Sequence, residues 1–404
     1  MMTILVLGSG GTVARAGKPY NYESGILSLE EVFQPVVYDK DKIRLEFEPI
    51  CDGDGVDMSS EDTLRLASQV RSKHDLPGVD AVLGLMGIDM VGSFMTVYTS
   101  LPRLRRPFIV SSAQVPATAL GADGPRNIGD AIMVAVHPEA SDRAAMFVFN
   151  GKIMCGPSIR KQSVISKDAF ESLPDKIGHV EDGCVHFKRL PTNFPTRVLL
   201  LEHLSTLSEL PRVKIETLTH DYDPDCIKLL IEHGKVRAFV FEAMGNGYCN
   251  SRRGEIKKLL EEHDVIAVIC TKTGEPLLKS NASFGIPGGY LPAANLEMLL
   301  KICLLTGRSR QEIKIIIHER GCVKLLQEAA RTEVKANTFN TRKTAHVPFL
   351  RDEKQQSTKM PTLQAEIYQT LIGARGINIA MVYNRDSYQR FLCDLSISST
   401  KAVS

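Results

Sequence analysis

The chain has 404 residues, of which 43% are hydrophobic and 24% are charged, and its net charge at pH 7 is +2. This composition is that of a soluble globular protein, and the near-neutral charge gives no reason to expect a nucleic acid or a membrane surface as a partner. No apolar run reaches the roughly 18 residues that a membrane span needs, and a chain this long is expected to form two domains.

The sequence opens with a strand and a glycine-rich turn. Residues 4–7 form an unbroken apolar run, which is typical of a strand buried on both faces of a parallel sheet. Three glycines among residues 8–11 then allow a tight turn, and Thr12 follows at once. The next segment, residues 14–25, is polar, so we expect a long loop of the kind that serves as a lid or binding loop.

Strands and helices alternate along the rest of the first half. Ser28 and Ser59 are placed to cap the first two helices. Alternation at this spacing indicates βαβ units and a parallel sheet. The expected strands are 44–51, 79–85, 108–112 and 144–149, and the expected helices are 27–33, 59–74, 92–101 and 127–136.

The same rhythm restarts after a proline-containing stretch. The sequence therefore predicts an α/β protein with a larger N-terminal parallel-sheet domain at 1–190, a linker at 191–211, a smaller C-terminal α/β domain at 212–318 and an extension of unknown role at 319–404. The remaining expected strands are 197–204 within the linker, 213–218, 238–242 and 265–270, and the remaining expected helices are 225–233, 254–263, 295–306 and 310–318.

The nine cysteines have no spacing typical of a metal site. Several lie in apolar runs, where cysteine behaves as a small core residue. We therefore expect a reducing, cytoplasmic location, with no metal and no cofactor. The N-terminus leads directly into a strand, so no signal peptide is expected.

Thr12 has three readings from its own segment: a nucleophile, part of a phosphate cradle, or a turn residue. A dinucleotide-binding fingerprint fits at Gly8 and Gly10, but Val13 occupies its third glycine position and a loop follows in place of a helix. A phosphate-binding P-loop fails because no Gly-Lys-Ser/Thr follows. From this segment alone, Thr12 could be either a nucleophile or an ordinary turn residue.

Other strand ends in the first half are also polar or rich in glycine. Asp57 and Asp89 each follow a strand, and Gln114 follows a third. The carboxyl ends of parallel strands meet at one crevice, where such sheets bind their ligands. Each aspartate taken singly could equally be a helix cap.

Five segments in order resemble the bacterial-type L-asparaginase/glutaminase family. The second segment, MGIDM at 86–90, stands where the family has His-Gly-Thr-Asp-Thr-Met. The resemblance covers residues 3–318. The segments are GGTVA at 10–14, MGIDM at 86–90, AQVP at 113–116, ADGPRN at 122–127 and AMGNG at 243–247.

The resemblance implies hydrolysis of a side-chain amide through a threonine acyl-enzyme. It places the nucleophile at Thr12, an activating tyrosine of the lid at Tyr22, and the assisting pair at Lys161 and Asp89. It makes Asp123 and Asn127 structural. It also implies a small-molecule amide substrate, a homodimer or homotetramer, and a substrate-binding set made of Gly11, Gly55, Asp57, Gly87, Ile88, Ala113 and Asn246.

Some residues depart from the family pattern. The second catalytic threonine is Ile88, which cannot donate or accept a proton, and the histidine of the same motif is Met86. Gly55 replaces a serine that binds the substrate carboxylate, and residues 277–279 offer no counterpart of a supporting glutamate. Ser9, Ser111 or an ordered water could replace the hydroxyl lost at Ile88.

Because of these departures, two alternatives to an asparaginase-type amidohydrolase stay open. One is a degenerate protein of the same fold that binds a small amino-acid-like ligand or a protein partner. Another is an enzyme whose pocket, reshaped by Ile88 and Met86, takes a less polar amide. A tRNA-linked amidotransferase subunit of this fold is disfavoured, because it normally carries a further N-terminal domain.

Overall fold

The computed structural model describes most of the first 321 residues. Expectations for Gly55, for most of the linker with its short strand, and for the extension beyond residue 321 fall outside the described residues. The first of the two units into which the chain divides, Met1–Val323, contains every described element. Not described are the side chain of Cys155 and residues 20, 24–25, 51–56, 102–104, 142, 144, 174–175, 189–197, 200–208, 274, 278–280 and 322–404.

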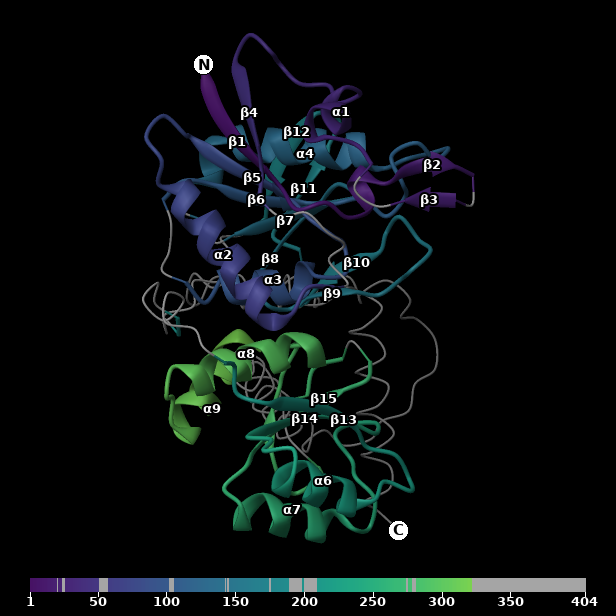
Figure 1. Ribbon diagram of the computed structural model, residues 1–404, viewed down its shortest axis with the longest axis vertical. Coiled ribbons are helices and arrows are strands. Elements are labelled where there is room, and N and C mark those ends of the chain that lie inside the picture. Colours follow the sequence, from purple (N-terminus) through teal and green to yellow (C-terminus); the bar gives the residue numbers. More distant parts are fainter. Residues whose placement is uncertain are drawn as a thin grey trace, which may run out of the picture. The chain divides into compact units, whose positions relative to one another are not determined.

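The first lobe, residues 2–187, is built on an eight-stranded sheet (Figure 1). Its first five strands along the chain are parallel, as expected, and the other three are added antiparallel. The spatial order is β12 (Cys184–Phe187), β11 (Gly178–Glu181), β8 (Lys152–Cys155), β7 (Met146–Phe149), β6 (Phe108–Ser111), β5 (Ala81–Leu85), β1 (Met2–Gly8) and β4 (Ile43–Pro49).

The expected parallel sheet is therefore a mixed sheet. Two hairpin turns produce the antiparallel part, one at Asn150 and Gly151 and one at Asp182 and Gly183. All four residues have positive φ, between 47° and 74°. Asn-Gly and Asp-Gly pairs favour two-residue hairpin turns of this kind, so the sequence did contain a signal for these strands.

The sheet is covered by helices on both faces. Ile4 and Val6 of β1 belong to the buried cluster with α1 (Leu29–Phe33) and α4 (Gly124–Val136), whereas Leu5 and Leu7 belong to the cluster with α2 (Ser60–His74) and α3 (Val91–Tyr98). Each of these four side chains is at most 5% exposed, and burial of each contributes about 1.5 to 3 kcal/mol. The expected caps are confirmed, because Ser28 and Ser59 each form a capping box.

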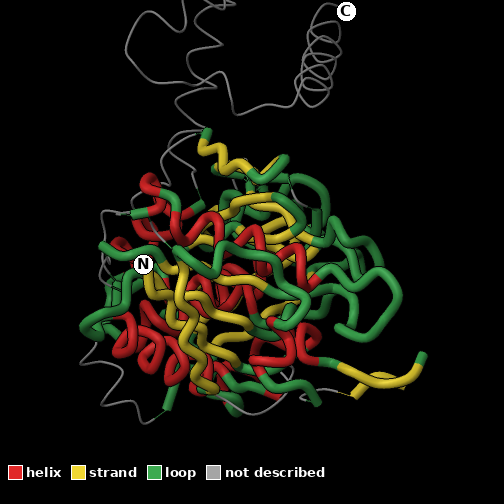
Figure 2. Tube along the Cα trace, turned by 90° about the horizontal axis from the view of Figure 1, so that it is seen from above, coloured by secondary structure: helices red, strands yellow, loops and turns green. Residues whose placement is uncertain are grey.

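The segment expected to be a loop after Thr12 contains a hairpin. Its strands are β2 (Ala16–Lys18) and β3 (Asn21–Glu23), which pair antiparallel. Figure 2 shows this pair of short strands extending away from the body of the lobe. The sequence predicted a long loop without strands here, and it missed the hairpin because three-residue strands are too short for an alternating pattern to be recognised.

The second lobe, residues 213–320, has a four-stranded parallel sheet. One face is covered by α6 (Pro224–Glu232) and α7 (Arg253–Glu262), and the other by α8 (Ala293–Leu305). The last helix, α9 (Arg310–Arg320), ends two residues beyond the expected 310–318. The strand order is β13 (Val213–Thr217), β14 (Ala238–Ala243), β15 (Ile266–Thr271) and β16 (Ile286–Pro287).

The two lobes share one apolar core. The buried cluster that includes α3 of the first lobe continues through α8 into one face of the second sheet. None of the helices within the described ranges is long and apolar enough to cross a membrane. The carboxyl ends of β1, β5 and β6 lie at one edge of the first sheet, where the candidate site is found.

Candidate functional site

The turn after β1 places Gly11, the residue before Thr12, against the segment that follows β5. Gly10 and Gly11 have φ values of 71° and 86°, a region that glycine adopts without strain. A Cβ atom on Gly11 would lie 2.5 Å from the Cα atom of Gly87, so the two turns can approach this closely only with glycine at position 11. Thr12 is half-buried and begins the short 3-10 helix η1 (Thr12–Ala14). Within the described ranges, no residue hydrogen bonds to its hydroxyl.

Asp89 and Lys161 meet although 72 residues separate them in the chain. Lys161 ends the short strand β9 (Ile159–Lys161), which pairs with β10 (Phe170–Ser172). Its Nζ atom lies 2.8 Å from Oδ1 of Asp89 in a hydrogen-bonded ion pair. The side chains are 22% and 56% exposed for Lys161 and Asp89, so the pair faces solvent. The structure thus brings together two of the four residues expected to be catalytic.

Ile88 points the other way from Asp89. Its side chain is 5% exposed and belongs to the same buried cluster as Met86 and Met90. Ile88 was expected in the substrate-binding set, but an apolar side chain in the core leaves only its backbone for a ligand. Two hydroxyls considered as replacements are engaged elsewhere, because Ser9 Oγ donates to the Leu85 carbonyl (3.3 Å) and Ser111 Oγ donates to the Val148 carbonyl (2.9 Å).

A polar network fixes the segment after β6. Asp123 accepts backbone hydrogen bonds from Gln114 and from Val115, at 3.1 and 2.9 Å. Asn127 donates from Nδ2 to the Ser112 carbonyl and to Asp123, both at 3.1 Å. These contacts give Asp123 and Asn127 the structural role expected for them.

Two further members of the network tie the strand ends together. Ser112 Oγ donates to the Met86 carbonyl at 2.7 Å, so β6 and β5 are joined next to Gly87. Ala113 is 1% exposed, and a Cβ atom on Gly124 would lie 3.5 Å from its methyl group. Ala113 can therefore serve a ligand only through its backbone. The sequence places Ser112 at a polar strand end but predicts no role for it, because a serine at a strand end carries no motif.

Tyr22 lies on the hairpin that follows Thr12. It is half-buried, and Gly17 stands opposite it across the two strands. Gly17 exchanges two hydrogen bonds with Thr118, whose hydroxyl accepts from the amide at 3.0 Å and donates to the carbonyl at 3.1 Å. The hairpin is therefore tied to the segment that follows Ala113.

The two described residues expected to bind substrate in the second lobe and in the loop before α2 are exposed to solvent. Asn246 is exposed in a tight turn, and its carbonyl accepts from Asn281 Nδ2 at 2.6 Å. Leu277, at the position without a glutamate, is fully buried and pairs with Gly289. Asp57 is exposed. No group of three or more His, Cys, Asp or Glu side chains suited to a metal ion occurs in the described part of the chain.

The chain is similar to known asparaginases over most of its length. The family model described as "Asparaginase, N-terminal" matches residues 3–193. L-asparaginase 2 of Bacillus subtilis is 24% identical over 327 residues, which are 78% of this chain and 86% of that protein. The glutaminase-asparaginase of Pseudomonas fluorescens is 24% identical over 256 residues, which are 62% of this chain and 70% of that protein.

A solved structure shows the same fold. The crystal structure of a probable cytoplasmic L-asparaginase from Campylobacter jejuni has a TM-score of 0.71 and 24% sequence identity, and the match covers 79% of this chain and all of that one. The solved structure thus shows the architecture, and the family model and the relatives show the family. The chain belongs to the L-asparaginase/glutaminase family and has its α/β fold, with a large mixed-sheet domain followed by a smaller parallel-sheet domain.

Proposed function

We propose that the protein is an asparaginase-type amidohydrolase, which converts L-asparagine or a related small amide to the acid and ammonia. The observation that carries the proposal is the ion pair of Lys161 and Asp89, formed at the same sheet edge where Gly11 packs on Gly87. A lysine and an aspartate that pair from distant segments, together with a threonine on a glycine turn at the same sheet edge, are the residue types that such a reaction needs as proton-transfer groups and nucleophile.

The reaction divides into two steps. The Thr12 Oγ atom forms a bond to the amide carbon, its proton leaves, and the carbon–nitrogen bond breaks as the nitrogen takes up a proton and departs as ammonia. Water then adds to the ester carbon and breaks the bond to Thr12, which releases the acid. We assign removal of the Thr12 proton to Tyr22, whose phenol oxygen takes it up as its own O–H proton passes on, and protonation of the leaving nitrogen to Lys161, which is held by Asp89 and regains a proton from Tyr22. In the second step the proton lost by the attacking water returns to Thr12 Oγ through the same groups.

Backbone groups complete the proposed site. The glycine turns at Gly11 and Gly87 have amides that suit the oxyanion, because fixed donors stabilise the charge that develops on the carbonyl oxygen. Asp57 and the backbone of Ala113 are proposed to bind the rest of the substrate. Asn246, exposed on its turn, is proposed to reach the site of another subunit in a homodimer or homotetramer.

One observation favours a second candidate function. Ile88 lies in the core, and the hydroxyls of Ser9 and Ser111 are bound to backbone carbonyls. Without a second hydroxyl, the same pocket could bind an amino-acid-like ligand without turning it over.

Ammonia release separates these functions. Full-length protein would be assayed with L-asparagine, L-glutamine and a panel of less polar amides, beside the Thr12→Ala and Ile88→Thr variants. Release that the Thr12→Ala variant lacks supports the amidohydrolase, and the best amide names the substrate. If wild type releases nothing, calorimetric binding of L-aspartate supports the binding protein. If Ile88→Thr alone is active, the wild type has lost catalysis at that position.

We also propose that the protein works in the cytoplasm. The described cysteines are free thiols, as suits a reducing compartment, and the similar Campylobacter jejuni protein is described as cytoplasmic. A relative in Haemophilus influenzae is described as a probable periplasmic L-asparaginase, so fractionation of cells that express the full chain is the test.

A further inference from the structure

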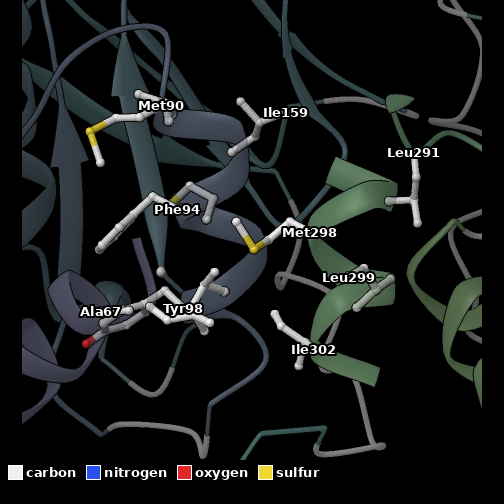
Figure 3. Close-up of a cluster of buried hydrophobic side chains, with 14 of the residues drawn as sticks. Ala67, Met90, Phe94, Tyr98, Ile159, Leu291, Met298, Leu299 and Ile302 are labelled. Atoms are coloured by element: carbon white, nitrogen blue, oxygen red, sulfur yellow. The ribbon is translucent and has the colours of Figure 1, made fainter. Parts of the chain in front are cut away.

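The two lobes meet where α3 packs on α8. Figure 3 shows Met298 of α8 reaching towards α3, with Ile159 of β9 beside the same contact, whereas the rings of Phe94 and Tyr98 point from α3 away from α8. Each of these side chains is at most 6% exposed. The two segments that lead to Asp89 and Lys161 are thus packed against a helix of the second lobe.

Asn295 is the polar residue of α8 at this contact. It is 3% exposed, and its Nδ2 atom donates to the Pro157 carbonyl at 2.6 Å and to the Ile159 carbonyl at 2.9 Å. Both amide hydrogens are used, and both bonds join the second lobe to the first. The second acceptor lies two residues before Lys161, so Asn295 holds the strand that carries this lysine.

The carboxamide oxygen of Asn295 lies against the other segment. A Cβ atom on Gly92 would sit 2.6 Å from Oδ1, so the close approach depends on glycine. Gly92 belongs to the first turn of α3, three residues after Asp89. One buried side chain therefore contacts both β9, which ends in Lys161, and α3, which begins two residues after Asp89.

We propose that Asn295 is a positioning residue for the Lys161 and Asp89 pair, through which the second lobe sets the geometry of the site in the first. Its catalytic meaning rests on the proposed function, but its effect on the pair does not. A carboxamide suits the place, because it offers two donors to two carbonyls without a charge. A carboxylate would offer no donor and would set its charge beside both carbonyl oxygens.

The same helix supplies a matched control. Lys301 of α8 also reaches the first lobe, because its Nζ atom donates to Ser60 Oγ at 2.9 Å. That contact is with the start of α2 and involves neither β9 nor α3. The Lys301→Met variant therefore loses a bond between the lobes without touching the elements that hold the pair.

The test uses full-length Asn295→Asp, Gly92→Ala and Lys301→Met proteins, with folding checked by urea unfolding. The first readout is the rate at which an amine reagent labels Lys161, followed by peptide mass spectrometry. We expect about a threefold rise in Asn295→Asp and Gly92→Ala, the size of losing a partly exposed ion pair, and no change in Lys301→Met. The second readout is turnover of L-asparagine, for which we expect kcat to fall about tenfold with little change in KM.

Each outcome has one meaning. Unchanged labelling of Lys161 in a folded Asn295→Asp protein overturns the proposal, and if that variant does not fold, Gly92→Ala decides in its place. An equal rise in Lys301→Met also overturns it, because the effect would then belong to the lobe contact in general. If wild type releases no ammonia, the proposed function fails, while the labelling result still tests the positioning.

Discussion

The carboxyl ends of the strands differ between the two sheets. In the second lobe, polar side chains at these ends bond within their own segment or to the next strand: Thr217 Oγ1 donates to Glu242 at 3.1 Å, and Thr271 Oγ1 donates to the carbonyls of Thr273 and Glu275 at 3.0 and 2.8 Å. In the first lobe, Asp89 pairs with Lys161, which lies far from it in the chain. Among the described residues, none forms a hydrogen bond with the hydroxyl group of Thr12. This difference supports our proposal that the first sheet carries the catalytic residues and that the second sheet has a structural role.

Loss of Lys161 should have the largest effect. A Lys161→Met variant is expected to lower kcat for the amide substrate by about a hundredfold or more, because it removes the group that we propose to protonate the leaving nitrogen. The control is Lys73→Met, which breaks the ion pair with Glu48 (2.6 Å), a pair formed between α2 and β4. Stopped ammonia assays give both rates, and an equal loss in the two variants would contradict a special role for Lys161.

The glycine contact next to Thr12 gives a second test of the first sheet. In Gly11→Ala the new methyl group would lie 2.5 Å from Gly87 Cα at a φ of 86°, so the turn must open. Gly78→Ala is the matched control, with a φ of 80° and nothing within 4 Å of the new carbon. Both variants should lose about 1 to 2 kcal/mol of unfolding free energy from the left-handed backbone, but only Gly11→Ala should also lose turnover, by about tenfold. Full activity in Gly11→Ala would show that the contact between Gly11 and Gly87 does not matter for turnover.

The amino end of the same sheet should control stability and not activity. Burial lowers the pKa of His74 to about 4 from an ordinary 6.5, although its Nε2 atom lies 3.2 Å from the Pro107 carbonyl just before β6. Between pH 6.5 and about 4, the His74 side chain is protonated in the unfolded chain but neutral in the folded chain. The free energy of unfolding therefore falls as the pH drops from 6.5 towards 4.

Urea unfolding at pH 7.5 and 4.5 measures this contribution. The loss due to His74 is about 2 to 3 kcal/mol, and the His74→Gln variant should show a pH dependence weaker by that amount. Its turnover at neutral pH should equal that of wild type. An unaltered pH dependence in the variant would mean that His74 is not held neutral in the fold.

The smallest effect is expected in the second sheet. A Thr217→Val variant removes the hydrogen bond to Glu242 and should cost about 1 kcal/mol of unfolding free energy. Turnover should stay within about twofold of wild type. Unfolding curves and the ammonia assay on one preparation give both numbers, and a loss of turnover like that of Lys161→Met would abolish the distinction between the two sheets.

Much of this arrangement follows from local sequence. The apolar run of β1 and the glycines before Thr12 identify a buried strand and a special turn, and Ser28 and Ser59 identify two helix starts. These features depend on neighbours in the chain, which is why residue patterns are enough to find them.

Other parts depend on contacts between distant segments. Nothing near Lys161 shows that it will meet Asp89, and only the family resemblance suggested the pair. The core position of Ile88 and the bonds of Asn295 to the first lobe likewise arise from packing across the chain. The strands of the β2–β3 hairpin were missed because each is only three residues long.

The central claim is that Thr12 forms the acyl-enzyme although Ile88 replaces the second threonine. The direct measurement is acid quenching during turnover of L-asparagine, followed by proteolysis and mass spectrometry of the peptide that contains Thr12. The account predicts an aspartyl ester on this peptide, absent from Thr12→Ala, whose ammonia release should be lower by at least about a thousandfold. Ammonia release by Thr12→Ala at the wild-type rate, or turnover with no acyl group on this peptide, would contradict it.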